Sequence, residues 1–231
     1  MSSPGELTGR AYFCFMDILL KYFSDFTPNQ IEQYRALEDL YKEWNEKINV
    51  ISRKDIDSLY EKHVLHSLAI AATFNFPPDL NIIDIGTGGG FPGVPLAIFF
   101  PEVNFHLVDS IGKKLKIIDA IASEIQLKNI TTQHTRAEDI KGRKFDFVVS
   151  RAVAPLKDLW RWSKPLLKAS SYKTQGSSEE QILLKSGLVC LKGGDLAKEI
   201  SESGTKPKSI EISKLFEEDF FKEKYLLYVT T

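Results

Sequence analysis

The chain has 231 residues, of which 43% are hydrophobic, and its 30 basic and 31 acidic residues leave a net charge of −1. This length and apolar content predict one globular domain with a full core, and no apolar run approaches the ~18 residues of a membrane span. The two cysteines, Cys14 and Cys190, lie in no metal or redox spacing, so a disulfide scaffold is excluded and the reducing cytoplasm is the expected location.

The first part of the chain predicts a helical region rather than a separate domain. Residues 1–15 have loop-like composition and are interpreted as an extension, residues 16–78 as helices packed on a core, and 79–231 as that core. Thr27, Pro28 and the glutamine that follows two residues later match a capping box with proline at the first helical position.

A first helix is expected to begin at Met16, and two more helices are expected after it. Apolar residues recur at helical spacing from the capping box to about Asn49, and another helix is expected from Asp55 onward. His63 and His66 lie three residues apart in the helix expected from Asp55 and share a face. No third ligand is evident beside them, so no metal site is expected.

The most informative stretch is residues 81–93, which read NIIDIGTGGGFPG. Apolar, β-branched residues around Asp84 predict a short buried strand, and a plausible helix begins at Gly93. Between them lie four glycines, at 86, 88, 89 and 90. A strand, a glycine turn and a helix let backbone N–H groups approach a ligand closely.

The ligand of this turn is not decided by the glycines alone. Counted from Gly86, the third glycine of a dinucleotide fingerprint falls on Phe91, whereas a register through Gly88, Gly90 and Gly93 matches but starts too late for the tight turn. No Gly-Lys-Ser/Thr follows, which excludes a phosphate P-loop. It also remains open that this stretch is a glycine-rich turn between a strand and a helix that binds no ligand.

Two carboxylates favour a nucleoside that bears an amino acid. Asp84 lies near the end of the first expected strand and suits an ammonium group, as in S-adenosylmethionine (SAM). Asp109 ends a second apolar strand about twenty residues beyond the glycine turn, the spacing at which an acid meets ribose hydroxyls in doubly wound nucleotide sites. Capping of the next helix is the competing role for Asp109.

From residue 82 onward, strands and helices alternate. Strands are expected near 82–85, 104–108, 130–134, 145–149 and 187–191, and helices near 93–100, 113–126, 155–167 and 195–201. This βαβ rhythm predicts a parallel, doubly wound sheet. Residues 210–215 and 224–229 are expected to close it as an antiparallel pair, and the serine-rich stretch 169–180 is interpreted as a flexible surface loop.

Charge is unevenly distributed along the chain. Residues 111–168 carry 13 basic and 6 acidic side chains, a net charge of +7, while residues 1–110 carry a net charge of −7. A basic half is compatible with a phosphate-rich partner, although the whole chain is not as basic as many nucleic-acid binders.

Several motifs in fixed order resemble one family. These are DIGTGGGFPG, HLVDSIGKK, RAEDI at 136–140 and FDFVVSRAVAPL at 145–156, and they resemble the glucose-inhibited division protein B family of bacterial ribosomal RNA guanine-N7 methyltransferases. The similarity runs from about residue 37 to 194. It implies the α/β SAM-dependent methyltransferase fold, with a Rossmann-like doubly wound sheet, a late antiparallel hairpin and an N-terminal helical region.

The resemblance also implies roles for individual residues. SAM is the implied cofactor, 16S ribosomal RNA in the small ribosomal subunit is the implied partner, and a monomer is expected. Where the family pattern often has an aspartate, this chain has His66, which puts a catalytic role for that position in doubt. The residues implied to bind cofactor are Asp84, Gly86, Gly88, Gly90, Phe91, Asp109, Ala137, Glu138 and Arg151.

Candidate substrate contacts are fewer. Arg151 follows the fourth expected strand, Lys192 lies in a family-like Lys-Gly pair, and Asn49 lies in WNEKINVISR, which resembles a family signature. A general base is not expected, because guanine N7 carries a lone pair and no proton. Two other functions stay open: an RNA-binding or ribosome-binding module that keeps a SAM pocket without catalysis, and an NAD-dependent oxidoreductase that uses the later glycine register.

Overall fold

The computed structural model describes residues 17–230 except 53, 152 and 176–180. The predicted extension, residues 1–15, and Cys14 within it therefore lie outside the described residues.

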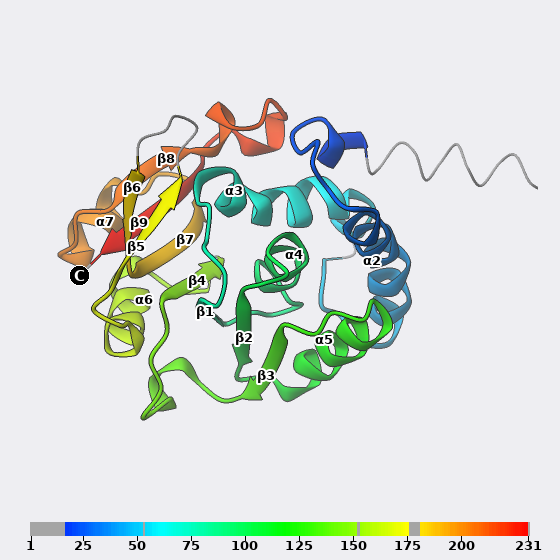
Figure 1. The fold of residues 1–231 in the computed structure, drawn as a ribbon, viewed down its shortest axis with the longest axis horizontal. Coiled ribbons are helices and arrows are strands. Elements are labelled where there is room, and N and C mark those ends of the chain that lie inside the picture. Colours follow the sequence, from blue (N-terminus) through cyan, green and yellow to red (C-terminus); the bar gives the residue numbers. More distant parts are fainter. Residues whose placement is uncertain (1–16, 53, 152, 176–180, 231) are drawn as a thin grey trace, which may run out of the picture.

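A seven-stranded, mostly parallel sheet forms the centre of the protein, in the order β3-β2-β1-β4-β7-β9-β8 (Figure 1). Strands β1 to β4 and β7 are parallel, while β9 runs antiparallel to both β7 and β8. The α/β fold class and the late antiparallel pair are thus confirmed. The strands are β1 (Asn81–Ile85), β2 (Asn104–Asp109), β3 (Ile130–His134), β4 (Phe147–Arg151), β7 (Gly187–Gly193), β8 (Lys208–Glu211) and β9 (Lys224–Thr230).

Helices cover both faces of this sheet, as a doubly wound fold requires (Figure 1). One apolar cluster joins the first face to α2 (Pro28–Lys47), α3 (His66–Thr73), α4 (Gly93–Phe99) and α5 (Gly112–Glu124). A second cluster joins the other face to α6 (Leu156–Ser163) and α7 (Ala197–Ser203). Because the central strands are apolar on both sides, they read as continuous hydrophobic runs in the sequence.

The helical N-terminal region packs on the central sheet and on α4. Thr27 and Gln30 form the expected capping box at the start of α2. The same Gln30 then donates from Nε2 to the carbonyl of Ile98 at 2.9 Å, and the Tyr34 hydroxyl donates to the carbonyl of Pro95 at 2.8 Å. These bonds tie α2 to α4 directly behind the glycine turn.

The helix expected from Asp55 is not a regular α-helix. A 3₁₀ turn, Ile56–Ser58, leads into a π-helical segment, Tyr60–Leu65, before α3 begins at His66. Such wide turns are rare and are frequent at functional sites.

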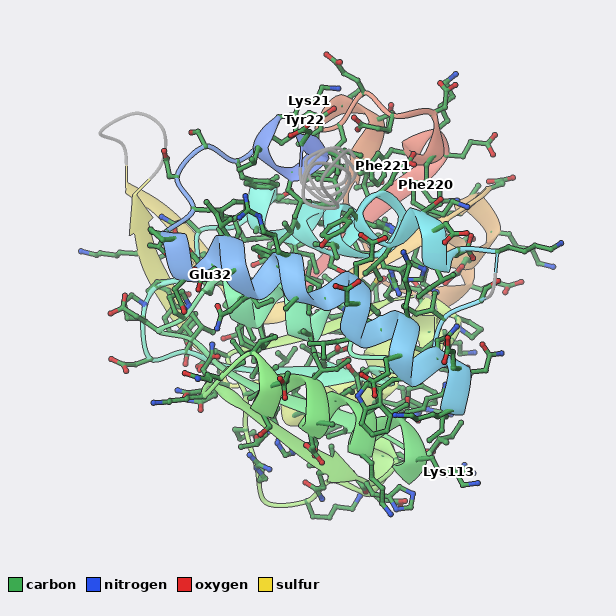
Figure 2. All side chains as sticks on the ribbon, turned by 90° about the vertical axis from the view of Figure 1, so that its right-hand side faces the viewer. Lys21, Tyr22, Glu32, Lys113, Phe220 and Phe221 are labelled. Atoms are coloured by element: carbon green, nitrogen blue, oxygen red, sulfur yellow. The ribbon has the colours of Figure 1, made fainter. Side chains whose placement is uncertain are left out.

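The described N-terminal end packs against the C-terminal part of the chain. The Tyr22 hydroxyl donates to Glu218 at 2.9 Å and its ring lies 4.7 Å from that of Phe216. Figure 2 shows Lys21 and Tyr22 close to the segment that bears Phe220 and Phe221.

Two sequence-based expectations were wrong in detail. Over its described part the stretch 169–180 is not simply a loop, because β5 (Ser171–Gln175) pairs antiparallel with β6 (Gln181–Lys185), while residues 176–180 lie outside the described residues. Tyr172 in β5 donates its hydroxyl to buried Asp146, and Leu184 in β6 is buried, so both strands of this pair contact the core.

The expected strand 210–215 ends early, at Glu211. Ile212 turns inward to full burial, where it shares the first apolar cluster with Phe216 and Phe221, and a 3₁₀ turn over Ile212–Lys214 replaces the strand. Among the described residues, no helix is long and apolar enough to cross a membrane.

Candidate functional site

A cavity of about 560 Å³ opens where β1, β2 and β4 end, at the carboxyl edge of the parallel sheet. Open α/β sheets bind ligands at this edge, and the volume lies in the usual range of ~300–1,000 Å³ for ligand pockets. Of the residues that the sequence nominated for the cofactor, the lining includes Gly86, Gly88, Asp109, Ala137, Glu138 and Arg151.

Three glycines of the turn after β1 adopt backbone angles that side chains disfavour. The φ angles are +67° at Gly86, +59° at Gly88 and +97° at Gly90. A Cβ on Gly86 would lie 2.4 Å from a methyl of Val153, and one on Gly90 would lie 2.7 Å from Val94. The turn therefore needs glycine both for its left-handed geometry and for its close contacts.

Asp84 lies fully buried beneath this turn and holds it in shape. Its Oδ2 accepts from the Thr87 hydroxyl at 2.6 Å and from the Gly93 N–H at 2.9 Å. Its Oδ1 is buried without a hydrogen-bond partner among the described residues. Burial raises the pKa of Asp84 to about 7, although the two hydrogen bonds and Arg151 oppose this shift.

Asp109 links the glycine turn to the segment that follows β2. Its Oδ2 accepts from the N–H of Gly88 and its Oδ1 from that of Ile111, each at 2.8 Å. The carboxylate thus holds the glycine turn next to Ile111, the residue directly before α5. Each oxygen has a second lone pair, so the group can still accept from a ligand hydroxyl.

The walls of the cavity carry apolar side chains that solvent reaches. Ile111 is 48% exposed and Val153 is 44% exposed, which is unusual for large hydrophobic residues in this structure. Ala137 and Glu138 form a 3₁₀ turn at the side of the cavity, and Trp162 from α6 adds a half-buried aromatic ring. Such a slot suits a flat, apolar ring system.

Arg151 reaches the cavity from the end of β4. Its guanidinium donates to the carbonyl of Lys62 at 3.2 Å and to Nδ1 of His63 at 2.9 Å, and it stacks 5.0 Å from the ring of Phe91. Both acceptors come from the π-helical segment. No carboxylate among the described residues lies within ion-pair distance of Arg151, so its guanidinium is not held by a salt bridge.

The histidines of this region are neutral. Burial and the nearby Arg151 lower the pKa of both His63 and His66 to about 3. His66 packs against Phe220 and Phe221 instead of facing the cavity. Among the described residues, no three His, Cys, Asp or Glu side chains gather as a metal site would require.

The stretch that contains Asn49 packs behind the glycine turn. Asn45, at the end of α2, accepts from the N–H groups of Val50 and Ile51, and a Cβ on Gly89 would lie 3.2 Å from the carbonyl of Val50. Asn49 itself is exposed beside this contact.

Phe91 and Lys192 are both buried and line no wall of the cavity. Lys192 pairs with Glu199 at 2.6 Å and donates to the carbonyl of Ala154. Glu199 also accepts from the N–H of Leu156, which anchors the start of α6. The Lys192–Glu199 pair therefore fixes the segment that follows Arg151.

Several residues of the site escaped the sequence analysis. Thr87 and Glu199 hold its loops, and Ile111, Val153 and Trp162 form its walls. Of these residues, Ile111 could have been noticed in the sequence, because it directly follows Asp109 and Ser110.

The sheet order with an antiparallel β9, and the glycine turn over a buried aspartate, define the fold class of SAM-dependent methyltransferases. Solved structures share this fold. A SAM-dependent methyltransferase from Aquifex aeolicus matches with a TM-score of 0.52 at 14% identity, covering 78% of this chain and 98% of the other. MtNAS in complex with MTA and tNA matches with a TM-score of 0.58 at 11% identity, covering 87% and 74%.

Sequence comparison gives the family. The model of the family described as rRNA small subunit methyltransferase G matches residues 30–185. Ribosomal RNA small subunit methyltransferase G of Phocaeicola vulgatus is 54% identical, covering 93% of this chain and 98% of the relative, and that of Bacteroides thetaiotaomicron is 52% identical, covering 92% and 98%. The chain belongs to this family, as its motifs had indicated.

Proposed function

We propose that this protein transfers the methyl group of SAM to N7 of a guanine in 16S ribosomal RNA of the small ribosomal subunit. The observation that carries the proposal is the grouping of Asp109, Arg151 and the exposed apolar Ile111 and Val153 around one cavity in a member of this family. The choice of guanine N7 rests on the family resemblance.

The residues fit SAM group by group. Asp109 would accept from the ribose hydroxyls, and Ile111, Val153 and the Ala137–Glu138 turn would hold the adenine. The glycine turn brings its backbone close to the methionine part because no Cβ intervenes. Asp84 lies beneath the turn rather than in the cavity lining, and its ionised form would supply negative charge for the ammonium group.

The reaction requires that guanine N7 and the methyl group be aligned, and it requires no acid–base catalysis. SAM, when bound, supplies a methyl group on a sulfonium. The N7 lone pair forms the new N–CH₃ bond while the S–CH₃ electron pair passes to sulfur, which leaves S-adenosylhomocysteine and a cationic base. No proton moves, so Asp84 need not act as a base.

Arg151 is the residue best placed to orient the guanine. Two of its five N–H donors serve Lys62 and His63, and the remaining donors are available to the guanine O6. Its stacking on Phe91 fixes the plane of the guanidinium. Holding two reactants in line contributes at most on the order of 7–11 kcal/mol, which is the main effect available here.

The test is radiolabelled methyl transfer from SAM to small-subunit particles that lack the modification, followed by nucleoside analysis. We expect 7-methylguanosine, a much lower single-turnover rate for Arg151→Ala, and an unchanged rate for the exposed control Arg35→Ala. The wild-type single-turnover rate at saturating SAM is expected to be nearly flat from about pH 6 to pH 9, because no catalytic base titrates. Methyl on a ring carbon, an amine or a ribose oxygen would refute the N7 assignment.

The same assay separates the alternatives. A ribosome-binding module without catalysis would bind SAM and RNA but transfer no methyl group. An oxidoreductase would bind NADH in place of SAM, and family membership argues against it. The expected monomer and cytoplasmic location stay predictions, which sedimentation and cell fractionation test.

A further inference from the structure

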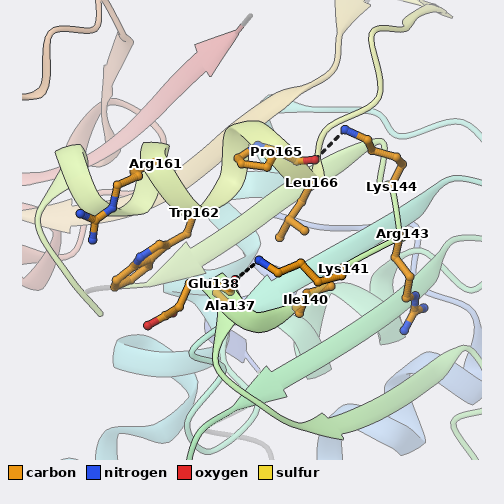
Figure 3. Close-up of a pocket in the computed structure, with 11 residues that line it drawn as sticks. Ala137, Glu138, Ile140, Lys141, Arg143, Lys144, Arg161, Trp162, Pro165 and Leu166 are labelled. Carbon is orange, nitrogen blue, oxygen red and sulfur yellow. Dashed lines mark hydrogen bonds between the residues drawn. The ribbon is translucent and has the colours of Figure 1, made fainter.

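A second cavity, of about 530 Å³, lies beside the cofactor cavity and shares the wall made by Ala137, Glu138 and Trp162 (Figure 3). Its floor is apolar, with Ile140 and Leu166. None of the proposed roles in methyl transfer uses this cavity.

The cavity exists because the connection from β3 to β4 lacks a full helix. Between these strands the chain makes only the 3₁₀ turn Ala137–Asp139, whereas α4 and α5 cover the sheet after β1 and β2. Thr131 and Gln133 of β3 are therefore exposed. A helix in this connection would cover the area that is open here.

Three cations line the opening, and their hydrogen bonds go to neutral groups. Lys141 donates to the carbonyl of Glu138 at 2.9 Å and Lys144 to that of Pro165. Arg143 donates to a ring nitrogen of His106 at 2.8 Å. Because none of the three pairs with a carboxylate among the described residues, their charges are left for an external anion.

An aromatic platform faces these cations. Trp162 is half-buried, and Figure 3 shows its indole ring across the cavity from Lys144 and Arg143. Arg161 lies beyond Trp162 and pairs with Asp158 at 3.0 Å. A stacking surface next to a row of cations is the arrangement that binds single-stranded nucleic acid.

We propose that this second cavity binds a nucleotide of the ribosomal RNA outside the target guanine, with its base on Trp162 and its phosphates at Lys141, Arg143 and Lys144. The inference rests on the proposed function for its choice of RNA as the ligand. The charge of the lining favours this occupant, because the described residues that line the cavity include four basic side chains and one acidic side chain, Glu138. The site therefore adds affinity for RNA and takes no part in bond formation.

The first test neutralises the three cations together, in Lys141→Gln/Arg143→Gln/Lys144→Gln. The matched control, Lys198→Gln/Lys214→Gln/Lys222→Gln, removes the same charge from exposed sites elsewhere. Binding to unmodified 16S ribosomal RNA is measured over a range of salt concentrations. We expect the Kd of the triple variant to rise roughly 10- to 100-fold near 0.1 M salt and its log–log salt slope to fall by about 2, since each lost phosphate contact removes ~0.7–0.9.

The Arg143 substitution could disturb folding through His106 and Phe145, so Lys141→Gln/Lys144→Gln is measured as well. Calorimetry with SAM reports the integrity of the cofactor cavity. We expect unchanged SAM affinity, and an unchanged single-turnover rate once RNA is saturating. An RNA Kd and salt slope equal to those of the control variants would overturn the proposal.

A second test addresses stacking. Trp162→Phe keeps an aromatic ring and is expected to retain RNA affinity, while Trp162→Leu is expected to lose about fivefold or more. Equal RNA affinity for both variants and wild type would overturn the stacking role. Failure of the wild type to methylate ribosomal RNA would refute the proposed function instead, and the RNA-binding comparison would still decide on this cavity.

Discussion

Replacing Asp84 by asparagine should change how the stability of the protein depends on pH. The carboxyl is fully buried, and its pKa is raised from 3.8 to about 7. The folded state therefore holds a proton on Asp84 at pH values where the unfolded chain has released it. Stability from this group is present below about pH 4 and is lost as the pH rises toward 7.

The size of the effect follows from the shift. Three pKa units at 1.36 kcal/mol each amount to about 4 kcal/mol, which is an order-of-magnitude value for a buried group. Asparagine can keep the acceptor for Thr87 and Gly93 but cannot ionise. We therefore expect Asp84→Asn to gain stability relative to wild type between pH 4 and 7, and the difference to stay constant at higher pH.

Urea unfolding of both proteins at half-unit steps from pH 4.5 to 8.5 measures this difference. Glu46→Gln, which removes an exposed carboxylate at the end of α2, controls for loss of one acidic group from the chain. Parallel stability curves for wild type and Asp84→Asn would refute the argument, because they would mean that Asp84 has the same pKa in both states. Addition of SAM at pH 6.5 should release protons if its ammonium group lowers that pKa.

Further substitutions test the rest of the site. Asp109→Ala should weaken SAM by about 1.5–3 kcal/mol in calorimetry, the size of hydrogen bonds to a charged group, and unchanged affinity would exclude the ribose role. Tyr41→Phe removes a 2.6 Å hydrogen bond to the carbonyl of Gly89 and should cost about 1–3 kcal/mol of unfolding free energy, because that buried acceptor loses its partner. Lys192→Met should lower methyl transfer and leave SAM affinity nearly unchanged, so an equal loss in both would contradict a role confined to the segment after β4. Deletion of residues 1–15 should change neither melting temperature nor activity, and a large drop in either would show that they pack on the core.

The sequence specified the sheet and the approximate place of the site because both depend on local patterns. Continuous apolar runs predicted the buried parallel strands, and a glycine-rich turn between strand and helix marked the ligand edge. The capping box, which spans the four residues from Thr27 to Gln30, was enough to predict where α2 begins. Such signals need no knowledge of distant contacts.

Other features escaped the sequence because they depend on contacts between distant segments. The residues of β5 read as polar surface, yet Tyr172 donates to buried Asp146, which lies 26 residues away in the sequence. The strand expected over 210–215 ended at Glu211 because full burial of Ile212 in the core outweighed its local β propensity.

Asp84, Arg151 and Lys192 show most clearly which features the sequence predicts and which depend on the tertiary structure. The sequence placed all three at one edge of the sheet and determined the family of the protein. Only the tertiary structure decided that Arg151 lies at the cavity, where it contacts His63 and Phe91. It also decided that Asp84 is buried below the turn and that Lys192 forms an ion pair with Glu199. The reason is that the burial of an ionisable side chain, and the groups that surround it, depend on how the fold packs the chain segments around it.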